Sequence, residues 1–187
     1  IYIGNPTQYI FYNVVANHTL LVKFIWGTHN IIVYHGNHGL ISPSGTVVVN
    51  HSSSQSFTFT PDTGYKIDSI IVDGLFAGDS SSYTFYNIII DHSLKVKFSL
   101  KMYNIIATAG SDGAIAPSGN ISVSHGAKQK FSFTPNTNFV VDSVFVDGGS
   151  IDSLVSFTFK NVTANHTIYV KFLLKRYTIT ASAGEHG

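Results

Sequence analysis

Apolar and polar residues alternate with a period of two along much of this chain, which is typical of a β-strand with one buried face. In Gln55–Thr60 two phenylalanines, Phe57 and Phe59, are flanked by serine and threonine residues. The same alternation recurs in Ser82–Tyr86, where aromatic residues take alternate positions. The apolar spacing does not follow the 3.6-residue period of an amphipathic helix. The sequence therefore predicts a mainly β fold.

Turn-forming residues divide this pattern into short segments. Between residues 27 and 100 the expected strands are Asn30–His35, Thr46–Asn50, Gln55–Thr60, Lys66–Val72, Ser82–Tyr86 and Leu94–Phe98. The Gly-, Pro- and Ser-rich stretch Gly36–Gly45 predicts turns, and the strands on either side of it are expected to form a hairpin. Asp73-Gly74 is a strong signal for a two-residue hairpin turn. The connection Asn87–His92 is expected to contain one turn of 3₁₀ helix.

The whole pattern repeats after 74 residues. Ser42-Pro43-Ser44-Gly45 returns as Ala116-Pro117-Ser118-Gly119, and about 30 of the 74 positions are identical without a gap. Internal periodicity on this scale predicts an array of tandem units. The expected divisions are 1–26, the C-terminal part of a repeat; 27–100 and 101–174, two full repeats; and 175–187, the start of a further repeat. The fold class expected is therefore a tandem array of small strand-rich domains that forms a rod.

The incomplete repeats at the two ends predict that these residues belong to a longer polypeptide. Residues 1–26 correspond to 75–100, and residues 175–187 correspond to 27–39. Neither segment supplies repeat positions 40–74, so two copies of this chain cannot complete one unit between them. Adjacent repeats of a longer chain, or further copies of the chain, are the partners expected.

The joint between the repeats is short and apolar. Only Ser99–Met102 separates the last expected strand of one repeat from the first of the next, which is too short for a flexible linker. The residues expected to pack between neighbouring repeats are Trp26, Leu100, Met102 and Leu174. These joints predict a stiff array.

Composition narrows the classes of function. Charged residues make up 11% of the chain and aromatic residues 13%, and the formal net charge is +1. Without a basic tract, the electrostatic footprint of a nucleic-acid-binding protein is missing. There is no cysteine, so disulfides and thiol chemistry are excluded. No apolar run approaches the roughly 18 residues of a membrane-spanning helix, and no membrane insertion is expected from this sequence.

Candidate chemistry is sparse. The histidines recur at equivalent positions of the repeat, as with His18, His92 and His166, and no pair has the close ligand spacing of a zinc site. The aspartates are too scattered to predict a calcium site, and Asp73 has a sufficient explanation as a hairpin-turn residue. No nucleophile, base and orienting group stand out together. We expect no catalytic residues, no metal site, no cofactor and no enzymatic activity.

Two kinds of surface feature suggest contact with sugars. The in-phase aromatic residues could form a sugar-stacking face, although strand alternation explains them fully as core residues. Candidate N-glycosylation sites, each an asparagine two residues before serine or threonine, are Asn17, Asn50, Asn120, Asn161 and Asn165. A surface of low charge, rich in Ser, Thr and Asn, would suit a glycan coat.

Two stretches resemble one known family: Phe57–Gly74, read as FTFTPDTGYKIDSIIVDG, and Asn161–Phe172, read as NVTANHTIYVKF. They are similar to the divergent internalin B-repeat, which occurs in tandem in large bacterial and archaeal surface proteins, and the similarity extends over the whole chain. The resemblance implies a β-grasp-like module, an extracellular location at the cell surface, and no catalytic residues. The middle repeat departs from the family pattern at Asn87–Ser93.

Three functions remain open at this point. The first is a structural protein that forms a stiff extracellular stalk, fibre or filament, with lateral association through exposed strand edges. The second is an adhesin-type module that recognises a glycan or a partner protein. It would use the stretch that differs most between repeats, Leu75–Ser81 against Gly149–Val155. The third is an accessory region of an enzyme, for which the sequence offers no positive feature.

Overall fold

The computed structural model describes residues 3–4 and 6–185, with the side chain of His35 left out of the description. Strands account for 57% of the described residues, and no helix occurs among them. The expected mainly β fold is therefore confirmed. The one turn of 3₁₀ helix expected in Asn87–His92 is wrong. There β7 continues to Ile88 and β8 begins at His92, and the short connection between them is irregular.

The first half of the structure contains eight strands in two sheets, which we call the first unit. The strands are β1 (Thr28–His35), β2 (Gly39–Ser42), β3 (Gly45–Asn50), β4 (Ser53–Pro61), β5 (Tyr65–Val72), β6 (Leu75–Gly78), β7 (Ser82–Ile88) and β8 (His92–Leu100). A five-stranded sheet has the order β3-β1-β8-β5-β6, and a three-stranded sheet has the order β2-β4-β7. The first and last strands, β1 and β8, pair in parallel at the centre of the larger sheet.

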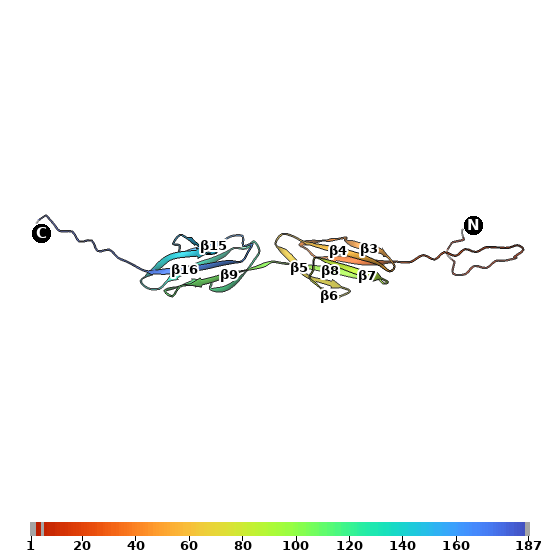
Figure 1. The fold of residues 1–187 in the computed structure, drawn as a ribbon, viewed down its shortest axis with the longest axis horizontal. Coiled ribbons are helices and arrows are strands. Elements are labelled where there is room, and N and C mark those ends of the chain that lie inside the picture. Colours follow the sequence, from red (N-terminus) through yellow and green to blue (C-terminus); the bar gives the residue numbers. More distant parts are fainter. Residues whose placement is uncertain (1–2, 5, 186–187) are drawn as a thin grey trace.

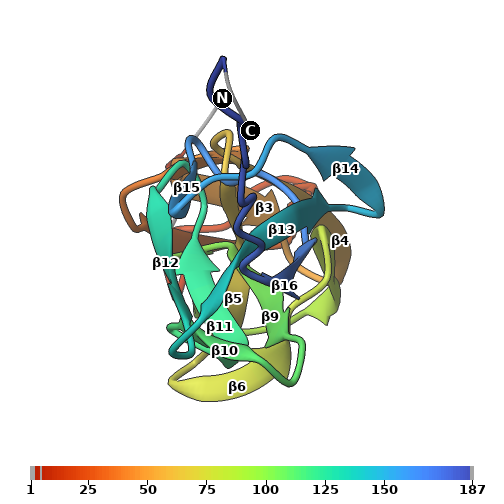
Figure 2. The ribbon, with the colours of Figure 1, turned by 90° about the vertical axis from the view of Figure 1, so that its left-hand side faces the viewer.

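The second half, which we call the second unit, repeats this order strand for strand. Its strands are β9 (Met102–Ala109), β10 (Gly113–Ala116), β11 (Gly119–Ser124), β12 (Gln129–Pro135), β13 (Phe139–Val146), β14 (Gly149–Ile151), β15 (Ser156–Phe159) and β16 (His166–Leu174). The sheets have the orders β11-β9-β16-β13-β14 and β10-β12-β15, and none of the four sheets closes on itself. In the end view of Figure 2, β12 and β15 lie on one side and β13, β16 and β9 on the other.

Each core is made where the two sheets of a unit face each other. The alternating stretch around β4 puts Phe57 and Phe59 into the core, at 0% and 4% exposure, while Ser56, Thr58 and Thr60 face outward. Phe131 and Phe133 take the same places in the second unit. Full burial of one such ring contributes roughly 1.5–3 kcal/mol. These rings are core residues, so they do not form a sugar-stacking face.

The glycine-rich stretch before β3 differs from the expectation. Gly36–Gly45 was expected to form turns only, yet it contains β2, which joins the smaller sheet beside β4. The expected antiparallel pairing of β1 with β3 is confirmed, with Ile31 opposite Val47. The chain therefore leaves the large sheet, adds one strand to the small sheet and returns. Alternation within single strands does not encode such a change of sheet.

Figure 1 draws the two units one after the other along the long axis of the molecule, with the two end segments on opposite sides. Residues 6–27 and 175–185 contain no strand and are exposed. Large apolar side chains in the first of these segments are open to solvent, among them Leu21 at 89% and Phe24 at 89% exposure. Only Lys101 lies between the end of β8 and the start of β9.

Candidate functional site

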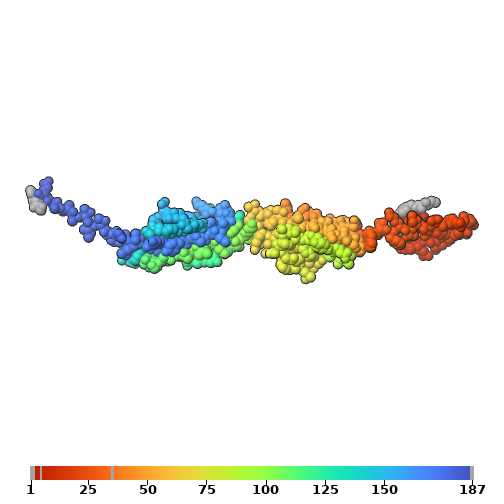
Figure 3. Space-filling view, viewed as in Figure 1, coloured from red at the N-terminus to blue at the C-terminus, as the bar shows by residue number. Residues whose placement is uncertain are grey.

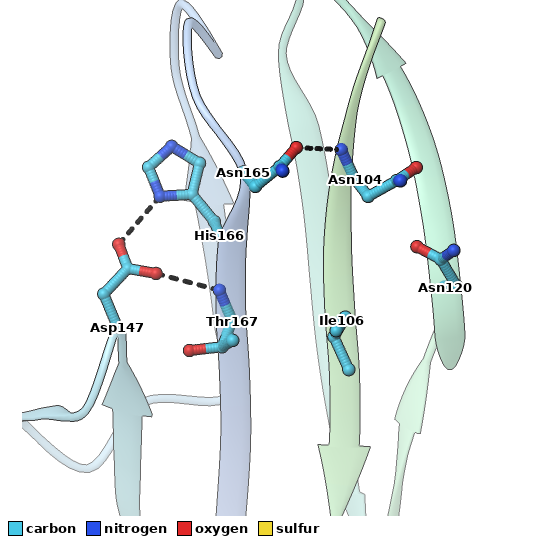
Figure 4. Close-up of a pocket in the computed structure, with 7 residues that line it drawn as sticks. All are labelled: Asn104, Ile106, Asn120, Asp147, Asn165, His166 and Thr167. Carbon is cyan, nitrogen blue, oxygen red and sulfur yellow. Dashed lines mark hydrogen bonds and ion pairs between the residues drawn. The ribbon is translucent and has the colours of Figure 1, made fainter.

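A pair of polar side chains joins a hairpin turn to the last strand of each unit. In the second unit, Asp147 and Gly148 form the turn between β13 and β14, with φ angles of 51° and 80°. Positive φ at both central residues is the type I′ geometry that suits a tight hairpin. This turn directs the Asp147 carboxylate at the start of β16, where His166 and Thr167 lie (Figure 4).

The Asp147 carboxylate uses both of its oxygens. Oδ2 lies 2.7 Å from Nδ1 of His166, and Oδ1 accepts a 2.8 Å hydrogen bond from the backbone N–H of Thr167. The backbone N–H of Asp147 in turn donates to the carbonyl of Thr167 at 3.1 Å. We call this arrangement the Asp–His clamp. It ties the β13–β14 turn to the first residues of β16.

Partial burial acts to raise the pKa of Asp147, but the hydrogen bonds from His166 and Thr167 and the nearby imidazole outweigh it. The pKa of Asp147 therefore lies below its ordinary value of 3.8. Asp73 in the first unit has a lowered pKa for the same reasons, with burial opposed by His92 and Ser93. Both carboxylates are therefore charged at neutral pH.

The first unit contains the same clamp. Asp73 Oδ2 lies 2.7 Å from Nδ1 of His92, and Oδ1 accepts a 2.7 Å hydrogen bond from the backbone N–H of Ser93. The histidine rings pack against equivalent phenylalanines, His92 on Phe85 at 4.9 Å and His166 on Phe159 at 4.8 Å between ring centroids. Because the partners are the same in both units, a structural role explains the clamp without a ligand.

A second polar contact joins the residue before β16 to the neighbouring strand β9. Oδ1 of Asn165 accepts a 2.9 Å hydrogen bond from the backbone N–H of Asn104, near the start of β9. In the first unit Asp91 takes this role and accepts from the N–H of Asn30 at 2.8 Å. Two different side chains thus satisfy the same backbone donor, since either offers an acceptor oxygen at the same position.

These residues surround an open hollow of about 260 Å³ on the outer face of the larger sheet of the second unit. Its lining consists of Asn104, Ile106, Asn120, Asp147, Asn165, His166 and Thr167. Figure 4 shows Asn165 directed toward Asn104, with Ile106 further along the strand of Asn104 and Asn120 on the neighbouring strand. Carboxamides, a carboxylate and a hydroxyl offer several donors and acceptors around one exposed apolar side chain. Chemically, such a hollow can hold a polyhydroxylated molecule by hydrogen bonds.

The clamp contains a histidine base and a carboxylate that orients it, as in nucleophilic catalysis, but it does not contain a nucleophile. Within the described residues no hydroxyl or thiol is hydrogen-bonded to Nε2 of His166 or His92. A catalytic arrangement would need such a nucleophile within hydrogen-bond reach of the base. The geometry gives no positive support for catalysis, and the expectation that the chain is not an enzyme stays a prediction.

Among residues 3–4 and 6–185, no three His, Cys, Asp or Glu side chains lie close enough together to hold a metal ion. The described part of the chain also contains no helix long and apolar enough to cross a membrane. The expectations of no metal, no cofactor and no membrane insertion stay predictions.

All five candidate N-glycosylation sites are exposed. Asn120 in β11 and Asn165 before β16 both line the hollow. Asn161 has a φ of 54°, and Asn87 and Asn13, its equivalents one and two repeats earlier, also have positive φ. Asparagine tolerates this region better than most residues, so turn geometry explains this asparagine without a glycan. Asn50 ends β3, and Asn17 lies in the strand-free segment.

The four residues expected to pack between repeats lie in different surroundings. Leu100 is half-buried at the end of β8, while Met102 and Leu174 are each 55% exposed. Trp26 is 78% exposed and stacks on the His51 ring at 5.0 Å. Their role in packing stays a prediction. The sequence analysis did not select Gly64 and His125, which make a close contact between the two units.

The residue pattern alone also does not connect the two members of the clamp. The residue pattern explains Asp73 as a hairpin-turn residue and His92 as one of the recurring histidines, each by itself. One signal was available: the aspartate and the histidine are separated by 19 residues in both repeats. Every pair of equivalent positions keeps its spacing in a gapless repeat, so this signal shows that both residues are retained and not that they touch.

No protein-family model matches this chain, and no curated protein or solved structure shows significant similarity to it.

Proposed function

We propose that this chain is a structural protein of the cell exterior, in which tandem strand-rich units form a stiff stalk, fibre or filament. The repeating units are residues 27–100 and 101–174. The observation that carries the proposal is the joint. A single residue, Lys101, separates two units with the same strand order.

That residue is hydrogen-bonded on both sides. The N–H of Lys101 donates to the carbonyl of Gly64 in the first unit at 2.8 Å, and its carbonyl accepts from the N–H of His125 in the second unit at 2.9 Å. A linker of one residue, held by both neighbours, has few conformations left. This arrangement supports a rod in which length is gained by adding units.

The strand order also supports the resemblance to the divergent internalin B-repeat. A central parallel pair made of the first and last strands, flanked by antiparallel neighbours, is compatible with a β-grasp-like sheet whose crossover is a strand instead of a helix. Under this proposal the units lie outside the cell, at the cell surface. They carry no catalytic residues, no cofactor and no nucleic-acid partner, and they interact with adjacent repeats or copies of the chain.

Edge strand β6 supports lateral association between copies. It lies at the edge of its sheet and exposes Leu75 at 74% and Phe76 at 72%. An edge with free backbone groups and apolar side chains is a template for pairing with another chain.

Imaging of the native assembly by electron microscopy tests the proposed function. A stalk or filament is expected to appear as a thin rod with a regular axial repeat from the 74-residue units. Isolated particles joined by flexible tethers, with no preferred angle between neighbours, would rule the proposal out. Small-angle scattering of the purified chain should give a maximum dimension that accommodates both units end to end.

An adhesin-type binding module is the second candidate, and the hollow of the second unit is the observation that favours it. The first unit has Thr46 and Asp91 at the positions equivalent to Asn120 and Asn165 of the hollow. A binding role predicts that a glycan array gives a signal that is lost in Asn104→Ala, with the first-unit variant Asn30→Ala as the matched control. Equal binding by both variants would argue against the hollow.

A further inference from the structure

The joint between the units depends on a glycine. Gly64 is buried in the turn before β5, with a φ of +85°. The imidazole of His125, in the turn after β11 of the second unit, lies directly against it. A Cβ at residue 64 would lie 2.3 Å from Cδ2 and 2.8 Å from Cγ and Nε2 of that ring. Real Cβ atoms do not approach other atoms so closely, and any side chain here would displace the ring.

The side chain of His125 is partly buried at the joint. Its Nδ1 is buried and has no hydrogen-bond partner among the described residues. Its backbone N–H donates to Lys101, whose own N–H donates to Gly64, so the three residues form one continuous contact. The ring also lies against Tyr103 at 5.9 Å between centroids. Figure 3 shows the two units meeting in a narrow contact at this joint.

The end of the second unit has a different residue at the same place. Asn138 corresponds to Gly64, with a φ of 68°, and its carbonyl accepts the N–H of Lys175 at 2.7 Å. The backbone contact at the end of each unit is therefore the same. Only the first unit has the bare surface on which an imidazole can lie.

We propose that Gly64 and His125 form a docking contact that fixes the two units as one rigid body, and that residue 64 selects the partner unit. An end surface with glycine at this position accepts a unit that presents histidine at the position of His125. An end surface with asparagine at this position, as at Asn138, leaves no room for that histidine. This inference deepens the proposed function and rests on it in one respect, because a fixed angle matters where the units form a stalk.

Gly64→Asn is the sharpest variant, since the second unit already uses asparagine in this turn with positive φ. The backbone strain is therefore small, and what remains is the overlap of the new side chain with the His125 ring. The matched control is Gly74→Asn, at a φ of +83° with nothing within 4 Å of the added Cβ. Residual dipolar couplings of the full 187-residue chain report whether the units share one orientation.

In the wild-type chain and in Gly74→Asn, couplings from both units are expected to fit a single alignment tensor. In Gly64→Asn this common tensor is expected to be lost. The double variant Gly64→Asn/His125→Ala should behave like His125→Ala alone, because the overlap is removed with the ring. If Gly64→Asn unfolds the first unit, His125→Ala tests the contact instead, because it leaves the Gly64 turn intact. This variant is expected to loosen the joint.

The outcomes separate this inference from the proposed function. A single tensor in the wild type that persists in Gly64→Asn and in His125→Ala would overturn the docking contact and leave the stiff stalk standing. Two independent tensors in the wild type would overturn the stiff stalk itself, whatever the variants do. A loss of the tensor in Gly74→Asn equal to that in Gly64→Asn would mean that turn strain is the cause, and it would also overturn the contact.

Discussion

The two units have the same architecture but differ at their surfaces. Their strand orders and their Asp–His clamps agree position by position. Among the surface differences are those at the hollow, at edge strand β6 against β14, and at the end turn with Gly64 or Asn138. The core phenylalanines are the same in both units, while other core positions exchange one apolar residue for another, as with Val33 and Ala107 or Leu94 and Ile168. Residues that a neighbour or ligand would meet have diverged.

The edge strands give the clearest instance. β6 presents the exposed apolar pair Leu75 and Phe76, while β14 has Gly149 and Ser150 at the equivalent places. Neither pair belongs to a core cluster. The edge can therefore change without cost to the interior, and the two units can share one fold while offering different surfaces.

The largest expected effect tests whether the two cores are equivalent. Phe57 and Phe131 are both fully buried, at 0% exposure, at equivalent positions. Replacement of either by alanine is expected to cost about 3–5 kcal/mol, through lost burial and the cavity left behind. Calorimetry of Phe57→Ala and Phe131→Ala should show similar losses, each in the altered unit. A difference of several kcal/mol between the two variants would show that the two cores are not equivalent.

The next effect concerns a close approach that both units share. A Cβ on Gly39 would lie 2.5 Å from the Phe98 ring, and one on Gly113 would lie 2.4 Å from the Phe172 ring. Gly39→Ala and Gly113→Ala are each expected to cost about 1–3 kcal/mol, because the rings must shift within a packed interior. Urea unfolding measures this, and Gly27→Ala, with open space around its Cβ, is the control. A loss of stability no larger than that of Gly27→Ala would mean that the two rings shift without a cost in free energy.

The clamp predicts a smaller effect that depends on pH. Because the pKa values of Asp73 and Asp147 are lowered by folding, the clamps stabilise the units above the unfolded-state pKa, near 3.8. This contribution is lost as the pH falls through the folded-state pKa values. Asp147→Asn is expected to cost about 1 kcal/mol at neutral pH, since the carboxylate is half-exposed.

Urea unfolding at several pH values checks this prediction. The double variant Asp73→Asn/Asp147→Asn should lose less stability than the wild type between pH 5 and about pH 2, because it has no clamp carboxylates to protonate. Asp68→Asn, an exposed aspartate outside the clamp, is the control. Parallel pH curves for the wild type and the double variant would contradict the stabilising role of the clamps.

The smallest effect concerns the acceptor that differs between the units. Asn165→Asp gives the second unit the residue that the first unit has at Asp91. Since both side chains offer an acceptor oxygen to the same backbone N–H, the change is expected to stay within about 0.5 kcal/mol at neutral pH. Asn165→Ala, which leaves the Asn104 donor without this acceptor, should cost more, about 1 kcal/mol. Thermal unfolding measures both losses of stability. A larger loss in Asn165→Asp than in Asn165→Ala would mean that aspartate cannot replace asparagine in the second unit.

The sequence by itself determined the β class, most strand positions and which face of the alternating strands is buried. The reason is local: a strand of period two, with Phe57 and Phe59 on one side, has only one face that can be buried. It also determined the Asp73-Gly74 hairpin, because two adjacent residues with positive φ need those residue types. Equal spacing of the two repeats carried these conclusions from one unit to the other.

Only the tertiary structure decided which strands are neighbours and which polar residues meet. Alternation says nothing about the partner sheet, so the departure of β2 into the small sheet was not predicted. The Asp–His clamp and the Gly64–His125 contact join residues far apart in sequence, brought together by strand order and by the joint. The strand-free segment makes the same point. Leu20 is 47% exposed, whereas Leu94, its equivalent in β8, is fully buried between β1 and β5. A strand pattern becomes buried only when neighbouring strands are present to cover it.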